Sequence, residues 1–353
     1  MSFTLCIATK DRSEFLRRLL GYYAQMEFPY PILIGDSSGP FHADRNKKTI
    51  ESLQRRLDIV FVDCPTLSSG ACCERLGELV STPYCAVVGD DDFLCTHGIH
   101  SCIQFLECHA DYAAAHGKGL IVGVDNGAVY GRIHSVGPYS MAVLEEASAS
   151  HRLLEFFTLS HYNLSYPVYR TRIWRTMFRG LTSLEGILNR NIFKDELIPS
   201  CIAAISGRIK ELEVLYLVRQ AHPAIYRHPD PFDWLTDSIW FPSYQFFLKR
   251  LKEELGLQGG LTGEQAHAVI KAVLWPYLAN ALCSSLKKRD SRGKRGRLRS
   301  RLRSLKGRIQ ALLWTHRWWD ADFMPIARAI AQPPCEVSKA AASILDRPQE
   351  VRA

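Results

Sequence analysis

The stretch of sequence that decides the fold runs Cys85-Ala86-Val87-Val88-Gly89-Asp90-Asp91-Asp92-Phe93-Leu94. Its first half is short, apolar and partly β-branched, and Pro83 stands just before it, which predicts a buried β-strand. Three consecutive carboxylates then end the apolar run. Ligands of open α/β sheets bind beyond the carboxyl ends of the strands, so we expect these acids to face a binding site.

The three acids also suggest a metal site. Side chains two apart on an extended backbone point to the same side, which directs Asp90 and Asp92 together and Asp91 elsewhere. Two converging carboxylates suit Mg²⁺ or Mn²⁺, because these cations prefer oxygen ligands and complete their shells with phosphate oxygens and water. A solvated turn is the alternative, since aspartate is common where strands end.

Strands and helices are expected to alternate around this stretch. Apolar runs at 3–8, 31–35 and 59–62 predict strands, and helical periodicity predicts helices that end at 26, 57 and 80. Asp11 and Glu14 have the spacing of a capping box for the first of these helices. The alternation predicts an α/β fold, a Rossmann-like domain with a mostly parallel central sheet.

The rest of the chain is expected to be mainly helical. The pattern predicts a helix over 97–116, a strand over 120–130, and a helix that begins near Asp195 and stops at Gly207. From Phe232 onward the spacing is helical and rich in aromatic residues. We therefore expect two regions, a nucleotide-binding and catalytic domain over 1–225 and a helical C-terminal region over 226–353.

The positive charge of the chain belongs to one segment. The 353 residues carry a net charge of +8, but 287–308 holds twelve Lys or Arg and a single Asp, a local charge of +11. The remainder is therefore at −3. A protein that is basic over its whole surface is excluded, and 47% hydrophobic residues indicate a globular chain with a sizeable core.

The composition points to the cytoplasm. The N-terminal apolar stretch lacks a basic region before it and is too short for a secretory signal. The longest apolar window, 268–282, is interrupted by Lys271, Pro276 and Asn280, which favours a buried helix over a membrane span. Eleven cysteines without C-x-x-C spacing are typical of reduced thiols, several of them buried.

Three motifs resemble those of a known family. Ile7-Ala8-Thr9-Lys10-Asp11-Arg12 is similar to the first-strand signature Pro-Thr-Tyr-Asn-Arg, Ile34-Gly35-Asp36-Ser37-Ser38 to the second-strand Val-Asp-Asp-Gly-Ser, and 70–92 to the helix and strand that lead to a D-x-D motif. Together they resemble the GT-A glycosyltransferases, in particular the large inverting family 2-like enzymes of bacteria. Ala8, Lys10 and Ser37 depart from that pattern, and these departures bear on base recognition more than on the fold.

The resemblance implies roles for individual residues. Thr9, Asp11, Asp36 and Asp90 would contact the nucleoside, and Arg219 the diphosphate. Asp90, Asp92 and His222 would hold Mn²⁺ or Mg²⁺, and Asp195 or Glu196 would be the general base. Each has a plainer alternative: Thr9 ends a strand, Asp11 caps a helix, Asp36 makes a turn, His222 is a surface residue, and the acidic pair interacts with a helix dipole.

The implied reaction is a metal-dependent transfer of sugar from a nucleotide-sugar donor to a hydroxyl of a glycan, lipid-linked or envelope acceptor, with inversion. A cation would stabilise the charge that develops on the diphosphate leaving group. A base on the far side of the sugar would take the proton of the acceptor hydroxyl. The sequence thus favours an enzyme that binds a nucleotide sugar.

Two other classes compete with this interpretation. A sugar nucleotidyltransferase also uses paired aspartates, but it normally has a glycine-rich loop, and 9–13 contains no glycine. A nucleic-acid-binding protein would use the basic segment. That segment, however, interleaves its arginines with Leu298, Leu302 and Leu305 and leads to Trp314, Trp318 and Trp319. This pattern over 287–319 predicts an amphipathic helix on an anionic membrane surface, on the inner face of the cytoplasmic membrane, and makes nucleic acid the less favoured partner. The alternative is that the helix docks on the catalytic domain and leaves its charges in solvent.

Overall fold

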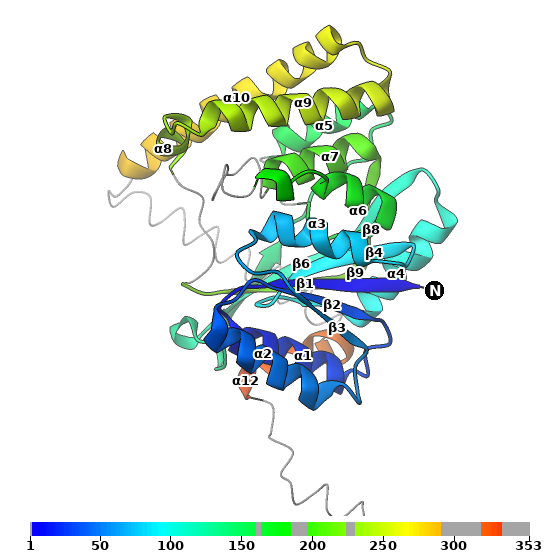
Figure 1. Cartoon of the computed structure of the whole chain (residues 1–353), viewed down its shortest axis with the longest axis vertical. Coiled ribbons are helices and arrows are strands. Elements are labelled where there is room, and N and C mark those ends of the chain that lie inside the picture. The colour runs from blue at the N-terminus through cyan, green and yellow to red at the C-terminus, as the bar shows by residue number, and fades with distance from the viewer. Residues whose placement is uncertain (1, 160–163, 185–195, 224–229, 291–318, 334–353) are drawn as a thin grey trace, which may run out of the picture.

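The structure is a computed structural model that describes residues 2–159, 164–184, 196–223, 230–290 and 319–333 (Figure 1). A nine-stranded sheet with the strand order β3-β2-β1-β4-β8-β6-β9-β5 crosses the molecule, and β7 pairs with β6. The strands are β1 Phe3–Thr9, β2 Ile32–Asp36, β3 Ile59–Asp63, β4 Tyr84–Gly89, β5 Phe93–Leu94, β6 Tyr112–Val124, β7 Ile133–Tyr139, β8 Val168–Arg170 and β9 Arg208–Ala221.

The helices lie on both faces of this sheet (Figure 1). They are α1 Ser13–Gln25, α2 Pro40–Leu53, α3 Ser69–Leu79, α4 Thr96–Cys108, α5 Ala149–Thr158, α6 Thr171–Phe178, α7 Ile198–Ser206, α8 Pro231–Leu235, α9 Trp240–Gly259, α10 Gly263–Asp290 and α12 Met324–Ala331. Strands β1 to β4 are parallel, as are β6 and β9, whereas β5, β7 and β8 run antiparallel to their neighbours. The predicted fold class, α/β with a mostly parallel sheet and a helical C-terminal part, is confirmed.

Each face of the sheet has its own hydrophobic core, because side chains of a strand alternate between the two faces. In β1, Leu5 and Ile7 pack with the apolar sides of α1, α4 and α12. Cys6 faces the other way, into a core built by α3, α5, α6, α7, α9 and α10. In Figure 1, α1 and α12 lie below the sheet and the second group of helices lies above it. The central strands are therefore buried on both faces, and only their ends reach solvent.

Most predicted elements are observed, and the exceptions have physical causes. The helix predicted over 97–116 is wrong beyond Cys108, because 112–124 forms β6 in the middle of the sheet. Ala113, Ala114 and Ala115 favour helix, but pairing with β8 and β9 overrides that preference. The capping box is not formed: Arg12 is the N-cap residue of α1 and makes no side-chain cap.

The helical C-terminal region is continuous in packing with the sheet domain. Phe247 and Leu251 of α9 and Ile270 of α10 belong to the same core as Cys6 of β1. The predicted division between residues 225 and 226 lies outside the described residues and stays a prediction, as does most of the basic segment 287–319. Within the described part of the chain the ten cysteines are free thiols, and all but Cys108 and Cys283 are buried.

Candidate functional site

The acid triplet forms a tight turn at the carboxyl end of β4. Asp92 donates its backbone N–H to the carbonyl of Gly89 at 3.1 Å, and β5 starts one residue later. The expectation that Asp90 and Asp92 point the same way on extended backbone is therefore wrong, because the chain turns at this point. All three carboxylates are buried, and each meets a different set of partners.

Asp90 faces strand β1. Its Oδ2 accepts a hydrogen bond of 2.6 Å from Thr9 Oγ1, and its Oδ1 lies 2.6 Å from a guanidinium nitrogen of Arg12. Complete burial raises the pKa of Asp90 to about 7, although the charge of Arg12 opposes that rise. Thr9 thus does more than end a strand, since its hydroxyl orients the first acid.

Asp91 faces His222, which follows β9. Its Oδ2 lies 2.7 Å from His222 Nε2 and accepts a hydrogen bond of 2.9 Å from Arg12. Burial alone would raise the pKa of Asp91, but the His222 hydrogen bond and the Arg12 charge outweigh it and lower that pKa to about 2. His222 is itself buried and packs 4.8 Å from the ring of Phe15, so it is not a surface histidine.

Asp92 faces β9 and the segment before β8. Its Oδ2 accepts hydrogen bonds from Tyr166 Oη at 2.8 Å and Arg219 Nε at 2.9 Å, and its Oδ1 accepts one from the Gln220 backbone at 3.1 Å. Burial raises the pKa of Asp92 despite these partners. The Arg219 guanidinium also lies over the rings of Tyr139 and Tyr166, at 4.9 and 5.3 Å. Arg219 is thereby fixed between two aromatic faces and an acid.

A buried arginine holds the backbone of the turn. Arg18 on α1 is 1% exposed and donates to the carbonyl oxygens of Asp91 at 2.8 Å and Val129 at 2.6 Å. It also donates to the Gln220 side chain and lies 4.8 Å from the ring of Phe93. Burial lowers the pKa of Arg18 to about 10, which leaves it charged at neutral pH.

Asp36 and Asp11 lie beside the triplet on the neighbouring strand ends. Thr9 of β1 and Asp36 of β2 are direct partners in the parallel register. Asp36 is buried and accepts hydrogen bonds of 2.8 Å from the Ser38 backbone and from the Asn46 side chain. Asp11 is exposed at a positive φ of 55°, and its side chain accepts a hydrogen bond of 2.8 Å from the backbone N–H of Gly39. It therefore joins the loops after β1 and β2 instead of capping α1.

Of the acidic pair, Asp195 lies outside the described residues. Glu196 is half-buried and stands two residues before α7, which ends at Ser206 just before Gly207, as predicted. The pKa of Tyr139 is raised mainly by burial, and the charge of Glu196 contributes to that rise. Because Arg219 lies over the Tyr139 ring, Glu196 is within electrostatic reach of the groups that surround Asp92.

The donor atoms at this edge are of the kind that Mg²⁺ or Mn²⁺ binds, namely carboxylate oxygens and an imidazole nitrogen. The buried Asp90 Oδ1 has no hydrogen-bond partner and faces Arg12 by charge alone. Within the described ranges no three Asp, Glu, His or Cys side chains form a group that could hold a metal ion. In this structure Asp90 pairs with Arg12 and Asp92 with Arg219. These arginine side chains are 29% and 22% exposed against 0% and 1% for Asp90 and Asp92, so the arginines reach solvent and the acids do not.

Comparison with known proteins rests on structure. Protein-family models give no match, and neither do curated proteins. S. aureus TarS 1-349 in complex with UDP-GlcNAc superposes with a TM-score of 0.50 at 12% identity over 81% of this chain and 81% of that one. The mannosyltransferase PcManGT from Pyrobaculum calidifontis, in complex with GDP-Man and Mn²⁺, gives a TM-score of 0.43 at 10% identity over 98% and 88%. The chain has a GT-A-like fold.

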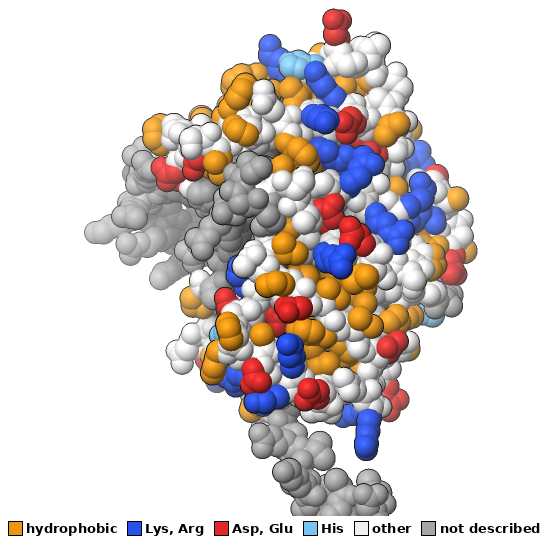
Figure 2. Space-filling model, in the orientation of Figure 1, with side chains coloured by type: hydrophobic (Ala, Val, Ile, Leu, Met, Phe, Trp, Pro, Cys, Tyr) orange, Lys and Arg blue, Asp and Glu red, His pale blue; other side chains and the backbone are white. Residues whose placement is uncertain are grey.

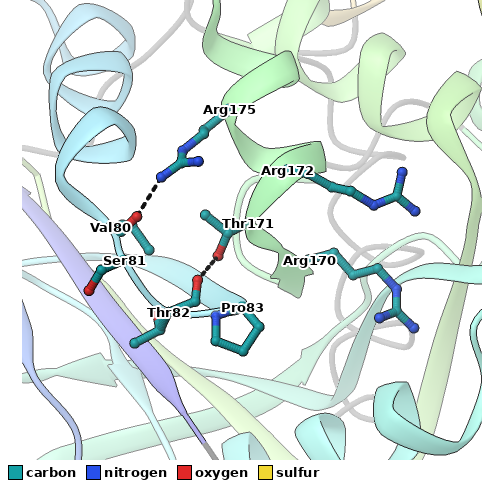
Figure 3. Close-up of a pocket in the computed structure, with 8 residues that line it drawn as sticks. All are labelled: Val80, Ser81, Thr82, Pro83, Arg170, Thr171, Arg172 and Arg175. Atoms are coloured by element: carbon teal, nitrogen blue, oxygen red, sulfur yellow. Dashed lines mark hydrogen bonds between the residues drawn. The ribbon is translucent and has the colours of Figure 1, made fainter.

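A cavity of about 430 Å³ lies at the other end of β4 in this GT-A-like fold (Figure 3). Its lining includes Arg170 and Arg175, but both guanidinium groups are committed to backbone carbonyls. Arg170 donates to Leu106 at 2.7 Å near the end of α4, and Arg175 donates to Gly77 at 2.8 Å near the end of α3. They cap helix C-termini, so this cavity is structural and is not the candidate site.

Four residues of the site were missed in the sequence. All four contact the triplet: Arg12 is the N-cap residue of α1, Arg18 lies in α1, Tyr166 precedes β8, and Gln220 lies in β9. Arg12 and Gln220 are adjacent to predicted site residues, which is the one signal that pointed to them. Arg18 and Tyr166 carry no motif, because hydrogen bonding to a distant turn leaves no local pattern in sequence.

Proposed function

We propose that the protein is a glycosyltransferase that moves a sugar from a nucleotide-sugar donor to a hydroxyl acceptor. The observation that carries the proposal is the convergence of Thr9, Asp36, the acid triplet and Arg219 at the carboxyl edge of the sheet. In open α/β sheets this edge binds nucleotides. The shared fold with TarS 1-349, which was crystallised with UDP-GlcNAc, supports the same class of donor.

The donor would lie across the ends of β1, β2 and β4. Asp36 and Thr9 would meet the nucleoside, with Asp11 fixing the loop above it through its bond to Gly39. Arg219, assisted by Arg12, would pair with the diphosphate, because guanidinium groups match phosphate oxygens and both side chains reach solvent. When the two arginine side chains turn to the diphosphate, the carboxylates that they now neutralise would become free.

Asp90, Asp92 and His222 would then hold Mn²⁺ or Mg²⁺, with Asp91 orienting His222 through its 2.7 Å contact. When bound, the cation supplies charge that stabilises the nucleoside diphosphate as the sugar leaves. The protein's own contribution is to keep these acids buried and aligned, which Arg18 does by holding the backbone of the turn.

Glu196, or Asp195 beside it, would serve as the general base. The base takes the proton of the acceptor hydroxyl on the side of the sugar opposite the leaving group, which produces inversion. The electrostatic link between Glu196 and Tyr139 supports a position near the donor site. The acceptor class that fits such a base is a hydroxyl of a glycan or a lipid-linked envelope precursor.

The test is a thermal-shift panel of nucleoside diphosphates with and without Mn²⁺, followed by nucleotide-sugar hydrolysis with the best ligand. We expect one nucleoside diphosphate to raise Tm, and Mn²⁺ to increase that rise, because a ligand that binds the folded state stabilises it. In Asp92→Asn the part of the rise in Tm that depends on Mn²⁺ should be lost. In Asp44→Asn, which changes an exposed acid on α2, it should remain. Stabilisation by nucleoside triphosphates with pyrophosphate release would instead identify a nucleotidyltransferase.

A further inference from the structure

Exposed hydrophobic side chains gather on the helices of the C-terminal region. Half of the ten large hydrophobic residues exposed in the described part of the chain belong to α8, α9 and α10. Four of them form what we name the apolar surface: Phe232 at 62%, Phe241 at 61%, Trp275 at 62% and Leu286 at 61% exposure. Isolated exposed hydrophobic residues are ordinary, but a group of aromatic ones on one unit marks an interaction site.

The helices that carry these residues pack together, with α10 against both α8 and α9. Trp275 and Leu286 are 11 residues apart on α10, about three helical turns, so they share one side of the helix. Ser285 donates a hydrogen bond to Asp230, the N-cap residue of α8, which brings Leu286 toward Phe232. Phe241 begins α9, which packs against α10. Figure 2 shows hydrophobic side chains reaching the surface in the upper part of the molecule, where α9 and α10 lie.

Helix α10 carries apolar residues on its exposed side as well as on its covered side. Ile270, Leu274 and Leu278 are buried in the core, while Ala272 and Trp275 face solvent. An 18-residue window of the stretch Gly263–Leu286 has a mean hydropathy of 1.3, but 28% of that window is buried, so the predicted buried helix is covered on one side only. Its length and composition alone would allow a membrane span, which is weak evidence, and its packing against α5 and α9 fixes it to the domain. The exposed apolar residues of α10 are therefore available for contact with a second surface.

Basic residues follow the apolar surface in the sequence. Helix α10 continues into Lys287, Lys288 and Arg289, the start of a segment that carries +11 while the rest of the chain carries −3. A second copy of the chain carries the same basic segment, so like charges disfavour pairing of two copies through the helix that leads into it. An anionic bilayer offers both a hydrocarbon boundary and negative charge, and tryptophan favours the headgroup region between them.

We propose that the apolar surface docks on an anionic lipid bilayer, with α10 lying along it. The inference is independent of the reaction proposed above. It also has a consequence for that reaction: in Figure 1 the carboxyl end of β1 and the ends of α8 and α10 all lie on the left of the molecule. A protein held by this surface presents its candidate site on the side from which a lipid-borne acceptor would approach.

The test is co-sedimentation of the full chain with vesicles of phosphatidylglycerol and phosphatidylcholine, or of phosphatidylcholine alone, at low and high NaCl. The variant Phe241→Ser/Trp275→Gln/Leu286→Gln removes three exposed side chains and should fold normally. A matched control, Phe41→Ser/Val60→Thr/Leu79→Gln, changes exposed hydrophobic residues elsewhere, at 68%, 46% and 43% exposure.

We expect the parent to bind anionic vesicles in a salt-sensitive manner and to bind neutral vesicles weakly. The triple variant should lose about tenfold in partition coefficient for each side chain removed, and the control should stay near the parent. The proposal is overturned by equal binding of the triple variant and the parent, by equal binding to neutral and anionic vesicles, or by no binding. A parent that forms dimers in solution, which the triple variant abolishes, would identify a second copy as the occupant.

Discussion

Three adjacent carboxylates in a buried turn would repel one another, and the surrounding side chains remove that repulsion one acid at a time. Arg12 lies between Asp90 and Asp91, and Arg219 pairs with Asp92. Taking away one partner of such a pair leaves an uncompensated buried charge, which costs far more than the pair itself contributes. A change in the charge balance of the site, such as the binding of a ligand would cause, would therefore also change the stability of the fold.

The Arg219 pair gives a prediction on stability. Arg219→Gln should lower the free energy of unfolding by about 3 kcal/mol, because Asp92 is then buried without a counter-charge. In Arg219→Gln/Asp92→Asn the charge is gone, and most of that loss should be recovered. Urea denaturation of the parent, both single variants and the double variant measures the coupling. Strictly additive effects would mean that the two side chains do not interact in solution.

The position of Glu196 gives a prediction on rate. Loss of a general base lowers the rate by ~10² to 10⁴-fold while ground-state binding survives, so Glu196→Gln should transfer sugar slowly and bind the donor normally. Glu78→Gln, on the exposed side of α3, is the matched control. Asp195→Asn is measured in parallel, and full transfer activity in both site variants would exclude the pair. Loss of donor binding in Glu196→Gln would assign this residue to the donor site instead.

At the scale of elements, α3 rests very closely on β2. A Cβ atom at Gly35 would lie 2.3 Å from Cys72 Sγ and 3.3 Å from two atoms of Leu76, so only glycine fits between this helix and this strand. The contact sets the distance of α3 from the sheet. The same strand ends at Asp36, so the packing of α3 also affects the position of this candidate site residue.

Gly35→Ala should therefore destabilise the protein by about 1 to 3 kcal/mol, the usual cost of overpacking a core. Part of the lost stability should be regained in Gly35→Ala/Cys72→Ala, which removes the sulfur atom that the new Cβ would meet. Gly137→Ala in β7 is the control, since the nearest atom to its new Cβ, in Ile121, is 3.6 Å away. Thermal denaturation gives the comparison, and equal Tm values for Gly35→Ala and Gly137→Ala would show that α3 shifts without cost.

At the scale of the whole molecule, the candidate site at the carboxyl edge of the sheet and the apolar surface are separate features of one packed unit. If the surface docks on lipid, it raises the local concentration of a lipid-borne acceptor and leaves the chemistry unchanged. The Phe241/Trp275/Leu286 triple variant should therefore keep the rate on a water-soluble acceptor. On an acceptor embedded in anionic vesicles, its rate should fall about as far as its vesicle binding. A parallel loss on the soluble acceptor would contradict this separation of roles.

The sequence by itself determined the alternation of strands and helices, the buried strand β4 and the acid triplet at its end. Hydrophobic periodicity and turn residues are local, so they specify burial and backbone preference over a few residues. The positions of Thr9 and Asp36 followed from the same logic, since parallel strands bring their carboxyl ends to one edge.

Only the tertiary structure decided which side chains surround each acid. Asp92 meets Tyr166 and Arg219, 74 and 127 residues away in the chain, because β9 enters the sheet in one register. The turn at 90–92, the strand at 112–124 and the open side of α10 likewise depend on neighbours that are remote in sequence. Local patterns record whether a residue is buried, but the partner of a buried charge depends on how distant segments pack together.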